Sequence, residues 1–137
     1  MEVDEAFSLI SRAIDAGRVA HGYLIVGDLK NCCEPLADRI MRKLFPDEIA
    51  QIEAKGHPDV AYLEPEGAKR IVTVKSMRER IVEPMSLAAF SGGWKVGVIV
   101  GADRMEAPSA NAFLKSLEEP TPKTLYLNPR GHTPPSA

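Results

Sequence analysis

A glycine that closes a short apolar segment marks a candidate phosphate-binding loop near the N-terminus. Such a loop follows the pattern G-x-x-x-x-G-K-[ST] between a strand and a helix, and its backbone amides, lysine and hydroxyl hold phosphate and magnesium. The corresponding residues here are Gly27, Asp28, Leu29, Lys30, Asn31, Cys32, Cys33 and Glu34. The first glycine is present, whereas the other three key positions carry different residue types.

The three substitutions remove the chemistry of the loop. Cys32 adds a side chain where the backbone must approach phosphate closely, Cys33 replaces the lysine cation, and Glu34 places a negative charge where phosphate or its metal would lie. Losing one charge-assisted hydrogen bond costs about 1.5–3 kcal/mol, and charge repulsion adds to that cost. Lys30 is an alternative phosphate cation, expected on the loop rather than at the helix start. The motif alone leaves an ordinary strand–loop–helix equally open.

Length and composition indicate one globular domain. The chain has 137 residues, 45% of them apolar and 26% charged, with a net charge of −2. This composition supports a core and gives no overall field that would attract nucleic acid or an anionic membrane. The apolar runs are far shorter than the roughly 20 residues that span a bilayer, and the acidic N-terminus is unlike a secretory signal. We therefore expect a soluble, cytoplasmic protein without a disulfide framework, since Cys32 and Cys33 are adjacent.

Hydrophobic periodicity predicts alternating helices and strands. Helices are expected between Asp4 and Gly17 and at residues 35–44, 74–82 and 109–119, and strands at residues 23–26, 60–63, 96–100 and 124–127. Asp4 is the expected N-cap of the first helix, Gly17 its left-handed stop, and Pro84 the end of the third helix. Strands separated by helices imply parallel pairing, and therefore an α/β fold with helices covering the sheet.

Two segments in the second half of the chain carry a family pattern. Residues 95–105 read KVGVIVGADRM, and residues 110–120 read ANAFLKSLEEP. They resemble the AAA+ core of bacterial clamp-loader subunits, the delta-prime and gamma/tau subunits of DNA polymerase III. In that family an apolar strand leads into an acidic pair, then A-D-R-M, then a helix reading A-x-N-A-L-L-K-x-L-E-E-P. The resemblance covers residues 6–127 and implies a three-layer P-loop NTPase fold with a parallel sheet.

The resemblance also implies a second loss of nucleotide chemistry. The family's acidic pair, which would bind magnesium and polarise the attacking water, falls at Val100 and Gly101, and neither residue can do so. Asp103 matches the A-D-R position beyond the pair. The phosphate loop and the magnesium-binding acidic pair have thus both lost their key residues. By the resemblance this is the pattern of delta-prime, and it differs from that of the ATP-hydrolysing gamma subunit. We expect no intrinsic ATPase activity, no bound ATP or magnesium and, because the family's four-cysteine module is missing, no zinc.

The helix that carries the family signature is expected to have a structural or interface role. Its signature residues are Asn111, Leu114, Lys115, Leu117, Glu118, Glu119 and Pro120. Periodicity places Phe113 and Leu114 in the core, while the last three signature residues shape the helix end.

Polar groups elsewhere in the chain have simpler interpretations. A local hydrogen-bonding role is expected for His21 and His57. The basic residues Lys69, Arg70, Lys75, Arg78 and Arg80 predict a solvated helix face, with a DNA or partner contact as the alternative.

The C-terminal segment departs from the family. By the resemblance, residues 1–127 are expected to form an incomplete AAA+ core without the last strand, the lid and the collar domain. Residues 128–137, NPRGHTPPSA, are expected to be a disordered or non-family tail. By the resemblance, the family's fifth strand flanks the first. The strand at residues 23–26 is therefore expected to be a bare hydrophobic edge that invites dimerisation, swapping or aggregation.

Three functional hypotheses follow. The first is a non-catalytic, delta-prime-like subunit that helps to load the sliding clamp during DNA replication. Its partners would be the gamma/tau and delta subunits and, through the complex, the sliding clamp and primer–template DNA; the parent complex is a DNA-directed DNA polymerase. The second is an ATPase that uses Lys30 as its phosphate cation. The third is a truncated fragment that only interacts with partners. No membrane partner is expected.

Overall fold

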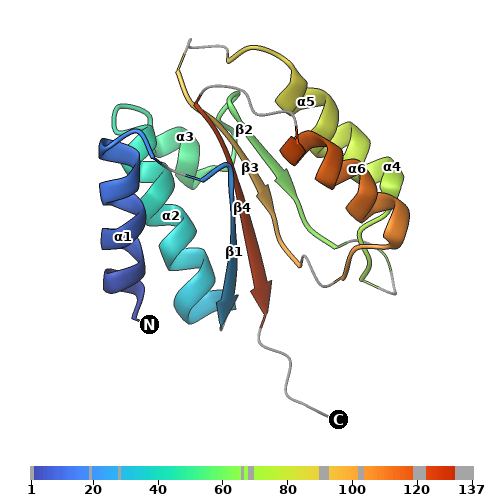
Figure 1. Cartoon of the computed structure of the whole chain (residues 1–137), viewed down its shortest axis with the longest axis horizontal. Helices are drawn as coiled ribbons and strands as arrows, with labels where there is room; N and C mark the ends of the chain where they lie inside the picture. The colour runs from blue at the N-terminus through green and yellow to red at the C-terminus, as the bar shows by residue number, and fades with distance from the viewer. Residues whose placement is uncertain are drawn as a thin grey trace.

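A central parallel sheet lies between two layers of helices (Figure 1). The computed structural model describes residues 2–18, 20–27, 29–65, 67, 70–89, 93–101, 104–118 and 123–131. The strands are β1 (Gly22–Gly27), β2 (Val60–Leu63), β3 (Lys95–Ile99) and β4 (Thr124–Gly131), in the order β1-β4-β3-β2. All neighbouring pairs are parallel. The α/β class, the parallel pairing and the four predicted strands are confirmed.

One face of the sheet is covered by α1 (Val3–Asp15), α2 (Glu34–Leu44) and α3 (Ile49–Glu53), with a π-helical turn, η1 (Leu29–Cys33), directly before α2 (Figure 1). The apolar face of α2 contributes Leu36 and Ile40 to this core. Val96 of β3 and Leu125 of β4 supply the sheet side of the same cluster. The four-residue spacing of Leu36 and Ile40 is that of a helix face buried against a sheet.

The other face is covered by α4 (Val74–Met77), η2 (Arg78–Val82), α5 (Glu83–Ser86) and α6 (Ala107–Glu118). Met77, Ile81, Phe113 and Tyr126 are buried in this second core. The ring of Phe113 meets that of Tyr126 edge-on, with centroids 5.2 Å apart. None of the described helices is long and apolar enough to cross a membrane.

The helix expected to stop at Pro84 continues through it. A π-helical turn, η2, precedes α5, and Pro84 stands in the first turn of α5. A proline there removes no essential hydrogen bond because the missing N–H falls where the bonding pattern changes. Burial of Met77, Ile81 and Met85 along one side holds the whole stretch against the sheet.

The N-cap prediction for the first helix was wrong, whereas the stop signal is confirmed. Glu2 is the N-cap residue and makes no side-chain capping bond, while Asp4 lies in the first turn and pairs with Arg39 of α2. Gly17 adopts a positive φ of 69° after the helix, as expected.

The chain remains a strand beyond residue 127, so of the two alternatives for the tail, disorder was wrong for residues 128–131. β4 pairs with β1 through Asn128↔Leu24, Pro129↔Ile25 and the two pairs that follow. Backbone pairing orders this segment although its side chains are mostly small or polar. Residues 132–137 lie outside the described part of the chain.

Candidate nucleotide site and adjoining pocket

The segment expected to be a phosphate loop is a helical turn. Gly27 is the last residue of β1, and η1 places Lys30 within a π-helix rather than on a loop, contrary to the sequence prediction. Cys33, at the N-cap of α2, already has helical angles, with φ −69° and ψ −49°. Phosphate binds at helix N-termini because the first amides there are free. Since α2 continues a preceding turn, its first amides do not form such a terminus.

The two adjacent thiols occupy different environments. Cys33 is buried and its Sγ lies 3.3 Å from the carbonyl oxygen of Ile25, to which it donates a hydrogen bond. Cys32 is exposed, and neither thiol is in a disulfide. Glu34, the first residue of α2, is also exposed. The position that carries lysine in a working phosphate loop is therefore filled by a thiol directed into the core.

The end of β3 has no room for a metal-binding carboxylate at Gly101. This residue has a φ of 76°, and a Cβ placed on it would lie 2.7 Å from Cγ of Pro65. Its amide donates to the carbonyl oxygen of Pro129 at 2.8 Å. Val100, partly buried beside it, offers no ligand atom in its side chain. Asp103 lies outside the described residues.

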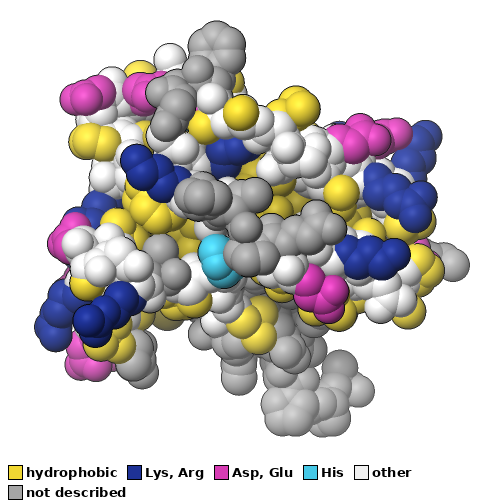
Figure 2. Space-filling view, turned by 45° about the horizontal axis from the view of Figure 1, so that its top comes forward, with side chains coloured by type: hydrophobic (Ala, Val, Ile, Leu, Met, Phe, Trp, Pro, Cys, Tyr) yellow, Lys and Arg dark blue, Asp and Glu magenta, His cyan; other side chains and the backbone are white. Residues whose placement is uncertain are grey.

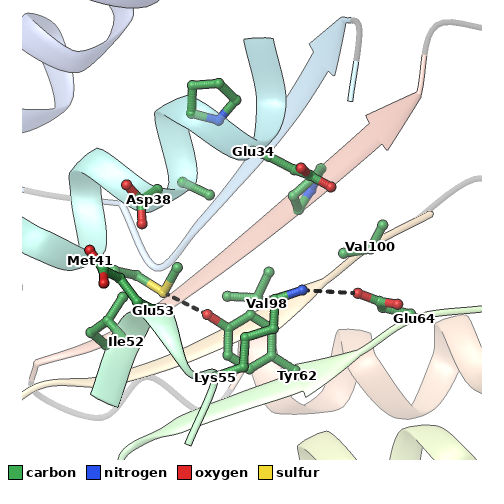
Figure 3. Close-up of a pocket in the computed structure, with 13 residues that line it drawn as sticks. Glu34, Asp38, Met41, Ile52, Glu53, Lys55, Tyr62, Glu64, Val98 and Val100 are labelled. Carbon is green, nitrogen blue, oxygen red and sulfur yellow. Dashed lines mark hydrogen bonds and ion pairs between the residues drawn. The ribbon is translucent and has the colours of Figure 1, made fainter. Parts of the chain in front are cut away.

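A pocket of about 340 Å³ opens between α2 and the C-terminal ends of β2, β3 and β4. Carboxyl ends of parallel strands are where ligands bind in open α/β sheets. The apolar lining consists of Pro35, Ala37, Met41, Ile52, Val98, Val100 and Pro129, and the polar lining of Glu34, Asp38, Glu53, Lys55, Tyr62 and Glu64. Figure 3 shows the carboxylates distributed around an apolar floor.

Negative charge exceeds positive charge around this pocket. Arg42 reaches both Asp38, at 2.7 Å, and Glu53, at 2.6 Å, so one guanidinium serves two carboxylates. These two partners raise the pKa of Arg42, Asp38 contributing more. Lys55 Nζ lies 3.7 Å from Glu64, and Glu34 has no ion-pair partner among the described residues.

Tyr62 lines the wall of this pocket, near the carboxylate of Asp38. Burial, and then the negative charge of Asp38, raise the pKa of Tyr62 to about 12. Its hydroxyl donates to Sδ of Met41 at 3.3 Å, and the Lys55 ammonium lies 5.7 Å from the ring centroid. The tyrosine therefore stays neutral and lines the pocket with an aromatic face.

These residues do not fit a nucleotide with magnesium. The described part of the chain contains no group of three or more His, Cys, Asp or Glu residues placed to hold a metal ion. Glu34 has no ion-pair partner among the described residues, and its exposed carboxylate would repel a phosphate brought to the start of α2. The arrangement favours neutral or cationic groups over phosphate.

The signature helix presents most of its family residues to solvent. Asn111, Lys115 and Glu118 are exposed, and Leu117 is half-buried. Leu114, expected in the core, is 51% exposed, whereas its neighbour Phe113 is buried. The prediction for Leu114 was wrong because α6 turns Phe113, and not Leu114, toward the described strands. Glu119 and Pro120 lie outside the described residues.

His57 has the local role expected of it. Its Nδ1 accepts a hydrogen bond from the Asp59 amide at 3.0 Å, and its ring packs 4.4 Å from that of Phe45. Its Nε2 lies 2.6 Å from a Glu48 carboxylate oxygen, although this contact does not have hydrogen-bond geometry. His21 is exposed, and its carbonyl oxygen accepts a hydrogen bond from the Tyr126 amide at 2.7 Å. The basic residues Arg70, Lys75, Arg78 and Arg80 are exposed, as a solvated face requires, and Lys69 lies outside the described residues.

Sequence reasoning missed the acidic lining of the pocket. Asp38 and Glu53 come from two helices and Glu64 follows β2, so no spacing in the sequence unites them. Only the position of Tyr62 and Glu64 at the end of a predicted strand was a usable signal, since such ends converge in a parallel sheet.

Comparison with solved structures first identifies the fold. The fold matches that of a DNA polymerase III gamma subunit-related protein from Thermotoga maritima, with a TM-score of 0.57 and 21% identity over 96% of this chain and 40% of that one. The chain thus shares the α/β core of that protein, and the α/β class predicted from the sequence is confirmed. Figure 2 shows basic and acidic side chains mingled on one face of that core.

Sequence comparison then identifies the family. Residues 3–128 match the profile described as "DNA polymerase III, delta subunit". Proteins named DNA polymerase III subunit delta' are 33% identical in Pseudomonas aeruginosa over 79% of this chain, 33% in Haemophilus influenzae over 86%, and 30% in Bacillus subtilis over 87%. The chain belongs to this delta-prime family. It spans 36–39% of the length of those relatives.

Proposed function

We propose that the protein acts as a non-catalytic, delta-prime-like subunit in the clamp loader of DNA polymerase III, taking part in loading the sliding clamp during DNA replication. The observation that carries the proposal is the state of the nucleotide site. Cys33 is directed into the core, Gly101 has no space for a side chain, and the charge beside them is negative. Such a subunit serves as a rigid neighbour for active ATPases.

The proposal makes the other loader subunits, gamma/tau and delta, the partners of this chain. Contact with the sliding clamp and with primer–template DNA is then indirect, through the complex. The exposed signature residues of α6 are available for a subunit contact, because Asn111, Lys115 and Glu118 are not used by the core. The protein needs no ATP, magnesium or zinc for this role, and it acts in the cytoplasm.

A titration with a fluorescent ATP analogue in the presence of magnesium tests the nucleotide part of the proposal. We expect no saturable binding up to about 1 mM, which corresponds to about −4 kcal/mol of binding free energy. Saturable binding that plain ATP displaces would favour the ATPase hypothesis instead. A gamma subunit with an intact phosphate loop serves as the positive control.

Reconstitution tests the partner part of the proposal. The purified chain is mixed with gamma/tau and delta, and co-elution is measured together with clamp loading on primed DNA. Co-elution with loading supports the loader role. Co-elution without loading supports an interaction-only protein instead. Failure to co-elute contradicts both.

A further inference from the structure

The pocket between α2 and the ends of β2, β3 and β4 has the size of a small-molecule site. Its volume of about 340 Å³ lies in the range of known ligand pockets, and β1 contributes none of its lining. Met41, Ile52 and Val98 give the pocket an apolar floor, and Tyr62 forms one wall (Figure 3). A cavity of this size fits a short ligand with an apolar body better than a helix or a strand of another protein.

One end of this pocket has an unbalanced negative charge. Arg42 of α2 reaches the carboxylate of Asp38 at 2.7 Å and that of Glu53, on α3, at 2.6 Å. Asp38 and Glu53 both line the pocket, whereas Arg42 does not. Because two carboxylates share one guanidinium, one negative charge is in excess at this end.

The opposite end has the same balance of charge. Glu64 lies 3.7 Å from the ammonium of Lys55, and Glu34, at the start of α2, has no ion-pair partner among the described residues. Figure 3 shows Glu34 and Glu64 toward one end of the apolar floor and Asp38 toward the other. Glu34 and Asp38 are four residues apart, so about 6 Å of helix separates them. The pocket therefore has two anionic ends with an apolar middle.

The wall between the two ends has an aromatic face suited to a cation. The Lys55 ammonium lies 5.7 Å from the centroid of the Tyr62 ring, within the distance at which a ring attracts a cation. The Tyr62 hydroxyl donates to Sδ of Met41 at 3.3 Å, which fixes the position of the ring. A metal ion does not fit, since no three metal-ligating side chains of the described residues are placed to hold one. An elongated organic cation fits, because it can lie along the floor and against the ring.

We propose that this pocket binds an aliphatic diamine or polyamine, a ligand with ammonium groups joined by a short apolar chain. One ammonium lies beside Glu34 and Glu64. The second lies beside Asp38 and Glu53, and the methylene groups between the two cover the apolar floor and the Tyr62 ring. Such a ligand balances the charge at both ends at once, whereas a monoamine or a metal ion carries its charge at a single point.

Isothermal titration calorimetry of the chain with 1,4-diaminobutane tests the proposal. At low ionic strength, where exposed charges are least screened, we expect one saturable site with a dissociation constant of about 1 mM or lower. Butylamine has the same carbon chain and one ammonium, and it should bind at least about tenfold more weakly. Magnesium chloride supplies a dication without an apolar chain and should not saturate the site. A diamine that fails to saturate at about 10 mM, or that binds no more tightly than butylamine or magnesium, would overturn the proposal.

Two variants locate the site. Glu34→Gln removes one carboxylate from the pocket and leaves the core intact, because Glu34 is exposed. It should weaken the affinity for the diamine at least about fivefold. Glu79→Gln, the same change at an exposed position of η2 on the other face of the sheet, should leave the affinity unchanged. Circular dichroism checks that both variants fold, and equal affinities of the two variants would contradict binding in this pocket.

Nuclear magnetic resonance gives a second measurement at the aromatic wall. The ring resonances of Tyr62 should shift as the diamine is added. Those of Tyr126, which is buried against Phe113 on the other face of the sheet, should not. Unchanged Tyr62 resonances at saturating diamine would overturn the proposal. None of these outcomes bears on assembly with the loader subunits, so the proposed function is judged separately.

Discussion

The ammonium of Lys95 donates a hydrogen bond to the carbonyl oxygen of Leu87 at 2.8 Å, which ties the first residue of β3 to the residue that ends α5. The same ammonium donates to the carbonyl oxygen of Pro84. Lys95 is 8% exposed, and burial lowers the pKa of its ammonium. A buried lysine thus binds carbonyl groups at the end of the helix, and that of Pro84 also accepts a hydrogen bond from the Leu87 amide at 3.3 Å.

Replacing this lysine should destabilise the fold. Lys95→Met keeps the apolar stem and removes the ammonium that makes both hydrogen bonds. Because hydrogen bonds to charged groups contribute about 1.5–3 kcal/mol, we expect the free energy of unfolding to fall by about 2 kcal/mol. Urea denaturation followed by circular dichroism measures the change. Lys75→Met, at an exposed position of α4, is the matched control and should change stability by less than about 0.5 kcal/mol. Equal effects at the two positions would contradict the helix-end role.

Tyr62 should make stability fall in alkaline solution. Its pKa is raised from 10.0 to about 12 in the folded protein, so the folded state holds the phenolic proton more tightly than the unfolded state. The stabilisation is fully present below pH 10 and is lost as the pH rises toward about 12. Between these values the wild type should lose more stability than Tyr62→Phe. Unfolding curves at successive pH values measure this difference, and parallel losses in the two proteins would show that Tyr62 is not the cause.

Gly101 should not tolerate a side chain. At Gly101 the backbone has a positive φ of 76°, and the Cβ of an alanine would lie 2.7 Å from Cγ of Pro65. We therefore expect Gly101→Ala to lower the free energy of unfolding by about 1–3 kcal/mol. Gly56→Ala is the control, because no described residue beyond its two chain neighbours has an atom within 4 Å of a Cβ placed there. Thermal unfolding compares the two variants. A Gly101→Ala protein as stable as the control would mean that the end of β3 could accept the family's carboxylate after all.

Phe113 and Leu114, neighbours on α6, should respond very differently to truncation. Phe113 is 7% exposed and packs on Tyr126, so Phe113→Ala should cost about 3–5 kcal/mol. Leu114 is 51% exposed, and Leu114→Ala should lower the free energy of unfolding by less than about 0.5 kcal/mol. Chemical denaturation at low protein concentration measures both. A large loss at Leu114 would restore the core role that periodicity predicted.

Much of this protein could be predicted from local pattern. Alternating apolar segments predicted every strand and the main helices, because burial on one or both faces leaves a period that can be read along the chain. The residue types at Cys33, Glu34, Val100 and Gly101 were enough to predict a degraded nucleotide site. The signature in residues 110–120 was enough to predict the family.

Other features depend on contacts between distant segments, and only the tertiary structure decided them. The order of residues 128–131 comes from backbone pairing with β1, which the polar sequence does not reveal. Asp38, Glu53 and Glu64 meet around one pocket because two helices and a strand end converge there. The exposure of Leu114 depends on which side of α6 faces the described strands. Local sequence thus determined the helices and strands, because burial leaves a period that can be read along the chain, whereas long-range packing decided the pocket and the exposure of Leu114.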